Sequence, residues 1–479
     1  MNRRLILQLS SATGSAVLGL MAYKGVRWRF QSNTGTVFAD NKAVDVEREV
    51  DNEIESELTL KQVQIFFRHG ARTPLKTIPN VEQANYEVRL FLAGVPHTLY
   101  NYTLRDLTGG GARPESSLEK HYRKHTLKGG AYIGQLTCLG QDQTYMLGRR
   151  IRRRYLDKFG LISDQYDPDS ILPHSTNTQR TIDSLRCVVA GIYGAVHLKK
   201  AGNVVLYTQD IGKEYLFPNG HHCDFLKKLT HKTLTNYGNI PGVKEERLKL
   251  EQVLGIDSSL DPKEQVCMVD VRDDIVCRKS HGFQVPEKLR EFEEIVERYA
   301  VGMVVYANTG TDGKLREEVV KLAMGRSLFM VIQKIEGAVK GEKGPKMMLY
   351  SCHDTSLIPL LVAMGIYDGK WPPFAADIAI ELYEDKKGEH WVKVQYLGED
   401  MTERGFGSPV VSVSQMKSAL SKYMVDNKRH KELCGATFPA QLQAPSDLNL
   451  PEGSLLPDHQ ETKEESAEAD EKAERPAGM

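Results

Sequence analysis

Three short apolar runs, each ending abruptly in polar residues, constrain the fold of this chain more than any other feature of its sequence. The runs at 62–67, 170–172 and 347–351 are predicted to be strands, because they are short and rich in residues that favour β structure. They end, in order, at Arg68-His69-Gly70, at Pro173 and at His353-Asp354. In an open α/β sheet, ligands bind beyond the carboxyl ends of strands, so the three ends are expected to face one crevice.

Helical patterns follow the second and third runs. One helix is predicted from about 178 to 194 and another through Ala363. The hydroxyl residues that could cap them are Ser175, Thr176, Thr355 and Ser356. Because strand-like runs alternate with helical ones along the chain, an α/β fold is predicted rather than an all-α or all-β one.

The size and composition of the chain exclude several classes of protein. At 479 residues it is long enough for one large domain with an insertion or for two ordinary domains. Hydrophobic residues make up 41% and charged residues 26%, which excludes disorder throughout. Lys plus Arg and Asp plus Glu are both 63, so no nucleic-acid partner is expected and any affinity for phosphate must be local.

The two ends of the chain differ in composition from the rest. Residues 1–39 contain several arginines and interleaved serines but no acidic residue, which predicts a mitochondrial transit peptide. A secretory signal at Leu5 to Tyr23 is the second interpretation, and a membrane anchor there is the third. The acceptor sequence Asn101-Tyr102-Thr103 matters only on the secretory route. Residues 451–479, with nine acids, three bases and no aromatic residue, are predicted to be a disordered tail.

One large domain is expected at 55–440, between these ends. Its stretches at about 76–128 and 217–313 are longer, more polar and less regular than the strand-bearing parts, and they are predicted to be insertions that form a cap and select the substrate. The seven cysteines form no C-x-x-C pair and no pattern with histidine typical of zinc sites, so no structural metal is expected. Their odd number and wide spacing do not describe a disulfide framework, although one or two bridges remain open.

The heptapeptide R-H-G-A-R-T-P at 68–74 carries the strongest chemical signal. Arg68 and Arg72 flank one imidazole, and guanidinium groups match phosphate oxygens in bidentate geometry. His69 between them can attack phosphorus as a neutral imidazole. Gly70 allows a sharp turn and a close approach to a ligand. Alternatively, the arginines are solvated surface charges and the histidine is an ordinary loop residue.

Two further positions complete a candidate site. Asp354 can donate a proton to a leaving alkoxide and then accept one from water, while His353 can donate to a phosphate oxygen. Arg180 lies at the start of the predicted helix at 178–194, where anions are favoured. The alternatives are that Asp354 is only a helix cap, that His353 packs in the core and that Arg180 is an exposed charge.

The chain resembles the histidine acid phosphatases from about Leu60 to about Cys434. The motifs that carry the resemblance are R-H-G-A-R-T-P-L-K at 68–76, L-K-G-G-A-Y-I-G-Q-L-T at 127–137, H-S-T-N-T-Q-R-T at 174–181, H-D-T-S-L-I-P-L-L at 353–361 and G-I-Y-D-G-K-W-P-P-F-A-A-D-I at 365–378. The resemblance implies a three-layer α/β core with a mainly helical cap. It also implies that His69 becomes phosphohistidine, that Asp354 is the proton donor, and that Arg68, Arg72, Arg180 and His353 bind phosphate without a metal or cofactor.

The substrate implied by the resemblance is lysophosphatidic acid, and the location implied is mitochondrial. An acidic pH optimum is expected, because Asp354 must hold a proton when the ester bond breaks. A broader acid phosphatase is one alternative. An inositol-polyphosphate phosphatase is disfavoured because H-A-E is expected where this chain has His353-Asp354-Thr355. A mutase that shares only R-H-G is unlikely on the spacing of the heptapeptide. A non-catalytic lipid or phosphate binder would be expected to lack His69 or Asp354.

Several residues remain outside this assignment. His174 stands where the family commonly has arginine, which affects the expected rim of the pocket. Leu90 to Leu92 and Trp371 to Phe374 are expected to be core residues, although they could line an apolar slot. The basic run at 149–154 is predicted to be a solvated helix face, with transient contact to anionic lipid as an alternative, and a buried stripe of Leu147, Ile151 and Tyr155. A monomer is expected.

Overall fold

The computed structural model describes residues 57–235, 242–258, 265–310 and 313–435. The targeting segment expected at 1–39 and the acidic tail expected at 451–479 lie outside these described residues. Among the helices that are described, none combines the length and the apolar character needed to cross a membrane.

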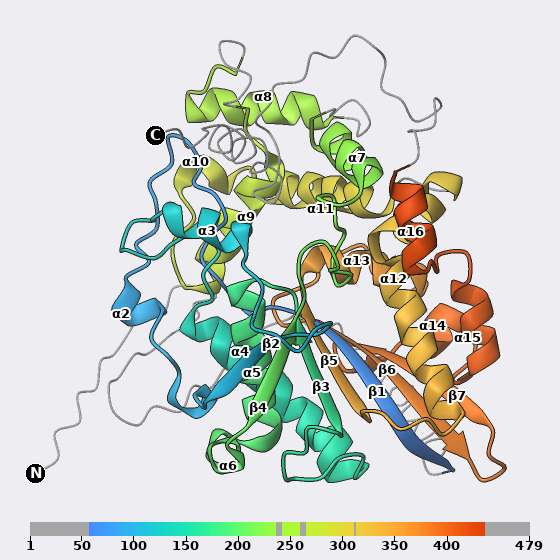
Figure 1. Ribbon diagram of the computed structural model, residues 1–479. Coiled ribbons are helices and arrows are strands. Elements are labelled where there is room, and N and C mark those ends of the chain that lie inside the picture. The colour runs from blue at the N-terminus through green and yellow to red at the C-terminus, as the bar shows by residue number, and fades with distance from the viewer. Residues whose placement is uncertain (1–56, 236–241, 259–264, 311–312, 436–479) are drawn as a thin grey trace, which may run out of the picture. The chain divides into compact units, whose positions relative to one another are not determined.

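The described strands form one mixed sheet of nine strands (Figure 1). Their order is β2-β4-β3-β5-β1-β6-β7-β8, and β9 pairs with β7. The strands are β1 (Leu58–Arg68), β2 (Tyr102–Asp106), β3 (Ile171–Ser175), β4 (Val204–Thr208), β5 (Met347–Cys352), β6 (Asp377–Asp385), β7 (His390–Tyr396), β8 (Glu399–Asp400) and β9 (Val411–Ser412). The three predicted strands are thus β1, β3 and β5. They are neighbours and run parallel, while β6 joins the other side of β1 in the antiparallel sense.

Helices cover both faces of the sheet, which gives three layers. The helices are α2 (Val88–Phe91), α3 (Ser117–Lys124), α4 (Cys138–Ile151), α5 (Gln179–Tyr193), α6 (Ala195–Ala201), α7 (Asp224–Thr235), α8 (Val243–Leu254), α9 (Met268–Ser280), α10 (Glu287–Arg290), α11 (Glu293–Thr309), α12 (Gly313–Val339), α13 (Asp354–Ala363), α14 (Thr402–Phe406), α15 (Val413–Leu420) and α16 (Asn427–Cys434), with a 3-10 turn at Pro96–Thr98 and a π-helical segment at Arg152–Lys158.

The central strand β1 shows how the layers arise from the sequence. Val63, Ile65 and Phe67 point to the face covered by α4 and α5, and Phe66 points to the face covered by α12, α13 and α15 (Figure 1). Both faces of this strand are buried from Gln62 to Arg68, so its polar residues need internal partners, and the side-chain amide of Gln64 donates to the carbonyl of Val331 at 3.0 Å.

The second predicted insertion forms a helical cap with its own core. Residues of α8, α9, α10 and α11 pack together in one hydrophobic cluster, to which Ile78 and Ile358 also belong. These helices lie beyond the carboxyl ends of β1, β3 and β5 (Figure 1). The first predicted insertion is different, because it contributes β2, which pairs with β4 and forms an edge of the main sheet. The sequence pattern did not predict β2, because this short edge strand contains several polar residues.

The two predicted helices begin where polar residues follow the strands; the expected cap of α5 is wrong, whereas the expected Ser356 takes part in capping α13. The N-cap of α5 is Thr178, and the N–H of Gln179 donates instead to the carboxylate of Glu119 at 2.6 Å. Thr176 does not cap α5, since its hydroxyl bonds that of Thr181 at 2.8 Å. The N-cap of α13 is His353, whose N–H donates to the hydroxyl of Ser356 at 3.3 Å.

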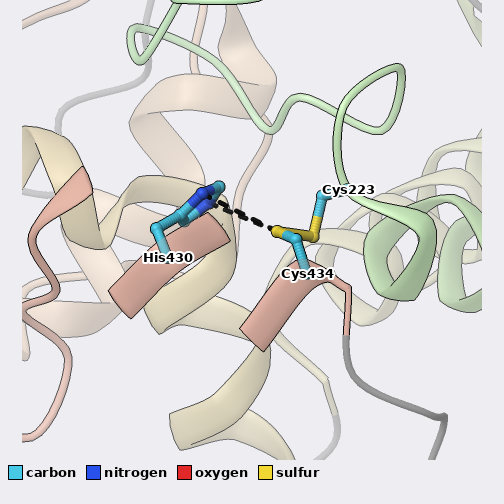
Figure 2. A group of neighbouring side chains, drawn as sticks. All are labelled: Cys223, His430 and Cys434. Atoms are coloured by element: carbon cyan, nitrogen blue, oxygen red, sulfur yellow. Dashed lines mark hydrogen bonds between the residues drawn. A yellow bond between two sulfur atoms is a disulfide. The ribbon is translucent and has the colours of Figure 1, made fainter. Parts of the chain in front are cut away.

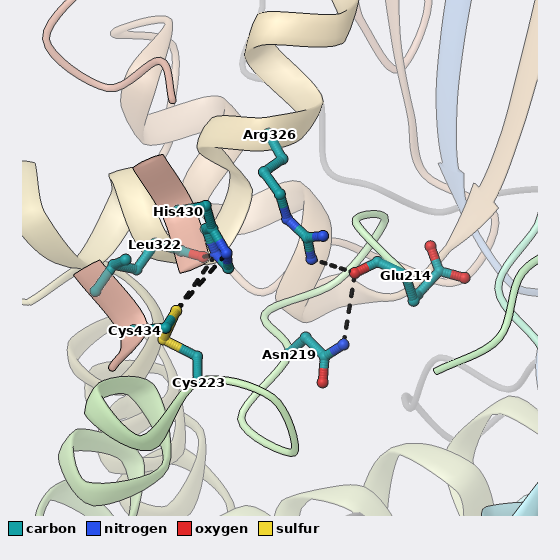
Figure 3. The surroundings of a disulfide bond; sticks show 7 residues. All are labelled: Glu214, Asn219, Cys223, Leu322, Arg326, His430 and Cys434. Atoms are coloured by element: carbon teal, nitrogen blue, oxygen red, sulfur yellow. Dashed lines mark hydrogen bonds between the residues drawn. A yellow bond between two sulfur atoms is a disulfide. The ribbon is translucent and has the colours of Figure 1, made fainter. Parts of the chain in front are cut away.

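A disulfide between Cys223 and Cys434 joins the cap to the C-terminal helix. Cys223 precedes α7, and Cys434 is the last residue of α16 (Figure 2). The segment from Glu214 to Cys223 is also bonded to α12, because Arg326 donates to the backbone carbonyl of Glu214 (Figure 3). The sequence left such a bridge open without favouring it, since a spacing of 211 residues carries no signal.

The substitution Cys434→Ser, which removes the disulfide, is expected to destabilise the protein measurably. A bridge that closes so long a loop restricts the unfolded chain, so its loss should lower the free energy of unfolding by about 2–4 kcal/mol. Guanidinium unfolding without reductant measures this, with Cys138→Ser as the control because Cys138 is a partly exposed free thiol. Equal unfolding midpoints for Cys434→Ser and the wild-type chain would contradict the prediction.

Candidate active site

The ends of β3, β5 and β1 bring the predicted site residues together. Arg68 pairs with Cys352 across β1 and β5, so the residues that follow these strands start at the same level of the sheet. The rings of His69 and His353 have centroids 5.7 Å apart. His353 Nε2 lies 3.1 Å from the hydroxyl of Thr176, which follows β3. The crevice expected beyond the strand ends therefore holds residues from all three.

The backbone of the loop after β1 is held by its surroundings. The N–H groups of His69, Gly70 and Ala71 donate, respectively, to the carbonyl of Cys352, the hydroxyl of Ser184 and the side-chain oxygen of Gln143. A Cβ on Gly70 would lie 2.1 Å from the carbonyl oxygen of Gly140 on α4. Glycine is thus required here by contact with a helix backbone. Because these N–H groups are occupied, an anion must be bound mainly by side chains.

His69 has the tautomer and charge that a nucleophile needs. Its Nδ1 lies 2.8 Å from the carbonyl oxygen of Gly70, and a carbonyl only accepts, so Nδ1 carries the proton. The lone pair is then on Nε2, for which the described residues offer no hydrogen-bond partner. Burial, together with the positive charges of Arg180 and Arg68, lowers the pKa of His69 well below 6.5. The imidazole is therefore neutral at mildly acidic pH.

Three buried arginines surround this imidazole. Arg68, Arg72 and Arg180 are all less than 10% exposed. Four of their N–H groups have no hydrogen-bond partner within the described residues: Arg68 Nε, Arg72 Nε, Arg180 Nε and Arg180 Nη1. Buried donors are nearly always paired in proteins, so four unpaired ones at a single site point to binding of an acceptor-rich anion.

Two carboxylates offset part of the positive charge. Arg68 Nη2 lies 2.6 Å from Asp354 Oδ2, and Arg72 forms a bidentate pair with Asp273 at 2.9 and 3.0 Å. Burial lowers the pKa of Arg68 to about 10, which leaves it charged at neutral pH. The site contains three guanidinium groups and two carboxylates, and its histidines are neutral. One positive charge is therefore left in excess, which favours an anion.

Asp354 accepts two hydrogen bonds and forms one ion pair. Its Oδ1 accepts from the N–H of Thr355 at 2.8 Å, its Oδ2 accepts from the Trp371 indole at 2.8 Å, and Oδ2 also pairs with Arg68. Burial alone would raise the pKa of Asp354, but Arg68 and the indole N–H outweigh it and lower this pKa to about 2. The carboxyl group is therefore ionised before an anion binds.

The segment Trp371 to Phe374, which was expected to be core, contacts the site. The backbone carbonyl of Pro372 accepts from Arg68 Nη1 at 2.8 Å, and the ring of Phe374 lies 4.3 Å from the Arg68 guanidinium carbon. Trp371 and Asp273 were not identified from the sequence. Their sequence signal was weak, because a tryptophan or a helical aspartate is more often structural.

Two other expectations need correction. His174 is fully buried on β3 with its Nδ1 3.4 Å from the Tyr215 hydroxyl, so it does not form a pocket rim. Phe91 and Leu92 pack against a small cluster as expected, whereas Leu90 is 52% exposed.

The basic run is less solvated than expected. Arg150 pairs with Asp377, and Arg154 Nε lies 2.6 Å from Glu381 Oε1, so both bind acids of β6. The predicted stripe of Leu147, Ile151 and Tyr155 is buried. These pairs reduce the charge that the run presents to a lipid surface.

One group of cysteines and histidines lies apart from the site. The ligand atoms of Cys223, His430 and Cys434 lie within 4.8 Å of one another, and His430 points toward Cys434 from one turn away on α16 (Figure 2). A cysteine sulfur binds a metal as the free thiolate, so the disulfide and a metal ion compete for the same sulfur atoms. The i, i+4 spacing of His430 and Cys434 was overlooked in the sequence.

Known proteins resemble this chain over most of its length. A family model described as "Histidine phosphatase superfamily (branch 2)" matches residues 59–254 and 289–396. Lysophosphatidic acid phosphatase type 6 of Mus musculus is 33% identical over 409 residues, which cover 84% of this chain and 94% of that protein. The protein of the same name from Homo sapiens is 32% identical over 385 residues, 79% of this chain and 87% of that one.

A solved structure shares the fold. The multiple inositol polyphosphate phosphatase of Bifidobacterium longum, in complex with inositol hexasulfate, matches with a TM-score of 0.50 and 12% identity. The match covers 78% of this chain and 94% of that one. At this identity the likeness concerns the fold alone.

Proposed function

This chain belongs to the histidine phosphatase superfamily, branch 2, and on that premise we propose that it hydrolyses lysophosphatidic acid to monoacylglycerol and phosphate through a phosphohistidine at His69. The observation that carries the proposal is the set of four unpaired guanidinium N–H groups around a neutral imidazole. Such donors match the equatorial oxygens of a phosphoryl group in transfer.

In the first step, His69 Nε2 attacks phosphorus. The N–P bond forms as the ester P–O bond breaks, and the leaving alkoxide takes a proton from Asp354. In the second step, water attacks the phosphohistidine, and the Asp354 carboxylate accepts the proton of that water. His69 is thereby released with inorganic phosphate. Arg68, Arg72 and Arg180 supply charge that other phosphoryl-transfer enzymes take from magnesium, so the steps require no metal.

The proton on Asp354 is best supplied together with the substrate. With a pKa of about 2, the carboxyl group carries no proton at mildly acidic pH before an anion binds. A bound phosphoryl group is a like charge beside the carboxylate, which raises the pKa of Asp354. A phosphate monoester keeps one proton below a pH of about 6, and the monoanion can pass that proton to Asp354.

The lipid substrate is supported by the relatives. Two proteins named lysophosphatidic acid phosphatase type 6 align with this chain over most of their length. A broader acid phosphatase remains the second candidate. For an inositol-polyphosphate phosphatase, the Bifidobacterium longum likeness supplies only a fold, and His353-Asp354-Thr355 differs from the expected H-A-E. Against a non-catalytic binder, both His69 and Asp354 are present.

Location is a separate proposal. The composition of residues 1–39 favours mitochondria, with the secretory pathway as the alternative. The disulfide between Cys223 and Cys434 supports an oxidising compartment within either route, because cytosolic thiols are kept reduced.

The proposal predicts a defined pH dependence. Phosphate release from lysophosphatidic acid, with chelator present, is expected to be fastest at acidic pH and to fall above about pH 6, where the ester loses the proton it brings. His69 stays neutral on the acidic side, because its pKa lies well below 6.5. Initial rates across the pH range measure this, alongside 4-nitrophenyl phosphate and inositol hexakisphosphate.

Each outcome of that experiment has one meaning. Release from the aryl phosphate but not from the lipid would retain the phosphatase chemistry and reject the lipid substrate. Preference for inositol hexakisphosphate would favour an inositol-polyphosphate phosphatase. A rate that climbs steadily above neutrality would reject the proton-delivery mechanism.

A further inference from the structure

The partners of Asp354 are distributed unequally between its two oxygens. Oδ2 accepts a hydrogen bond from Trp371 Nε1 at 2.8 Å and also lies 2.6 Å from Arg68 Nη2 in an ion pair. Oδ1 accepts from the N–H of Thr355 at 2.8 Å. Oδ2 therefore faces both a cation and a donor, whereas Oδ1 faces one donor and keeps a lone-pair site for a proton.

This asymmetry decides which oxygen can hold a transferable proton. A proton on Oδ2 would lie against the Arg68 guanidinium and compete with the indole N–H, whereas a proton on Oδ1 leaves the ion pair and both hydrogen bonds in place. We propose that Trp371 is a positioning residue that, together with Arg68, directs the acidic proton of Asp354 to Oδ1 and so aims it at the leaving-group oxygen. This inference deepens the proposed function and rests on it.

The indole is itself fixed from the cap. The guanidinium carbon of Arg272, on α9, lies 4.1 Å from the centre of the Trp371 ring system. Arg272 in turn is held by Glu297 of α11, with N···O distances of 2.9 Å. A cation over an indole face is attracted by the ring, and the ion pair keeps that cation in place. The cap thus determines the direction of the indole N–H.

The chemistry of the step follows from this placement. As His69 Nε2 bonds to phosphorus, the ester P–O bond breaks and the proton moves from Oδ1 to the departing oxygen. The carboxylate that forms keeps its two donors and its ion pair with Arg68, which stabilise it without rearrangement. Without the indole N–H, a second proton site opens on Oδ2, and part of the acid then points away from the leaving group.

The Trp371→Phe variant tests the inference. It keeps an aromatic face for Arg272 and removes only the N–H donor and one ring. The matched control is Trp391→Phe, because Trp391 Nε1 donates in the same way to Asp385 Oδ2, at 3.1 Å, far along the sheet on β7. The measured quantities are kcat/KM for lysophosphatidic acid and for 4-nitrophenyl phosphate, and the inhibition constant of inorganic phosphate.

The expected result depends on the leaving group. An alkoxide needs a proton to depart, whereas nitrophenolate hardly does, so Trp371→Phe should lower kcat/KM for the lipid by about tenfold to a hundredfold. The aryl ester should change by less than about threefold, and inhibition by phosphate should stay unchanged, because the three arginines are untouched. The ratio of the two esters does not depend on how much of the variant folds.

Two results would overturn the inference. Equal losses with both esters, or a parallel weakening of inhibition by phosphate, would show that Trp371 supports the fold or the anion site rather than the acid. Hydrolysis of neither ester by the wild-type chain would instead reject the proposed function, and this inference with it. The control Trp391→Phe must leave kcat/KM for both esters unchanged, whether Trp371 proves to act on the acid or on the fold.

Discussion

Alanine in place of His69 is expected to lower phosphate release from every monoester substrate by about four orders of magnitude or more, as loss of a covalent nucleophile does in other enzymes. The arginines would still bind phosphate, because their unpaired N–H groups do not depend on the imidazole. The inactive variant should therefore still bind inorganic phosphate. Because it has no activity to inhibit, this binding is measured directly, for example by calorimetry. Rapid mixing with labelled substrate, followed by an alkaline quench, should trap phosphoenzyme in the wild-type chain and none in the variant.

A control histidine makes this test specific. His197 is exposed on α6, and its Nδ1 lies 3.0 Å from the carbonyl of Tyr193, which resembles the bond of His69 to Gly70. No arginine pocket surrounds it in the described structure, so His197→Ala should retain full activity. If phosphoenzyme persists in His69→Ala, His69 is not the nucleophile. His353, whose ring centre is 5.7 Å from that of His69, would then be identified as the nucleophile.

Local sequence patterns predicted the strands that carry the site, but they misjudged where those strands end. The predicted strand at 170–172 stops at Pro173, whereas β3 continues to Ser175. Proline is tolerated there because β3 pairs with β4 at a single position, His174 with Tyr207, so the missing N–H interrupts little of that ladder. The full set of ladder bonds on the other side, with β5, holds the strand in place.

The sequence placed the groups that follow strands and overlooked those that reach the site from elsewhere. His69, His353 and Asp354 were recognisable because each comes directly after an apolar run. Asp273 lies on a cap helix 201 positions from Arg72, and nothing around it in the sequence distinguishes it from a solvated acid. Contacts at that separation depend on how the cap packs over the sheet, which hydrophobic periodicity does not encode.

Asparagine in place of Asp354 is expected to have the second largest effect. The amide is nearly isosteric but cannot donate an acidic proton, so kcat/KM for lysophosphatidic acid should fall by about 10² to 10⁴. Because kcat/KM reports the first step, kcat/KM for 4-nitrophenyl phosphate should fall by clearly less. Turnover of both esters should then be limited by the second step, because water attacks the phosphohistidine without its base, and phosphoenzyme should accumulate.

Phosphate affinity separates this role from simple damage to the site. Asp354 brings a negative charge within 2.6 Å of Arg68, so its neutralisation should leave phosphate binding unchanged or tighten it while turnover falls. Asp385→Asn is the matched control, since Asp385 also accepts from a tryptophan indole yet lies at the far end of β6. Weaker phosphate binding in Asp354→Asn would mean that the carboxylate only orders the arginines. Loss of turnover with phosphate binding intact would assign it the proton, because charge removal alone favours the anion.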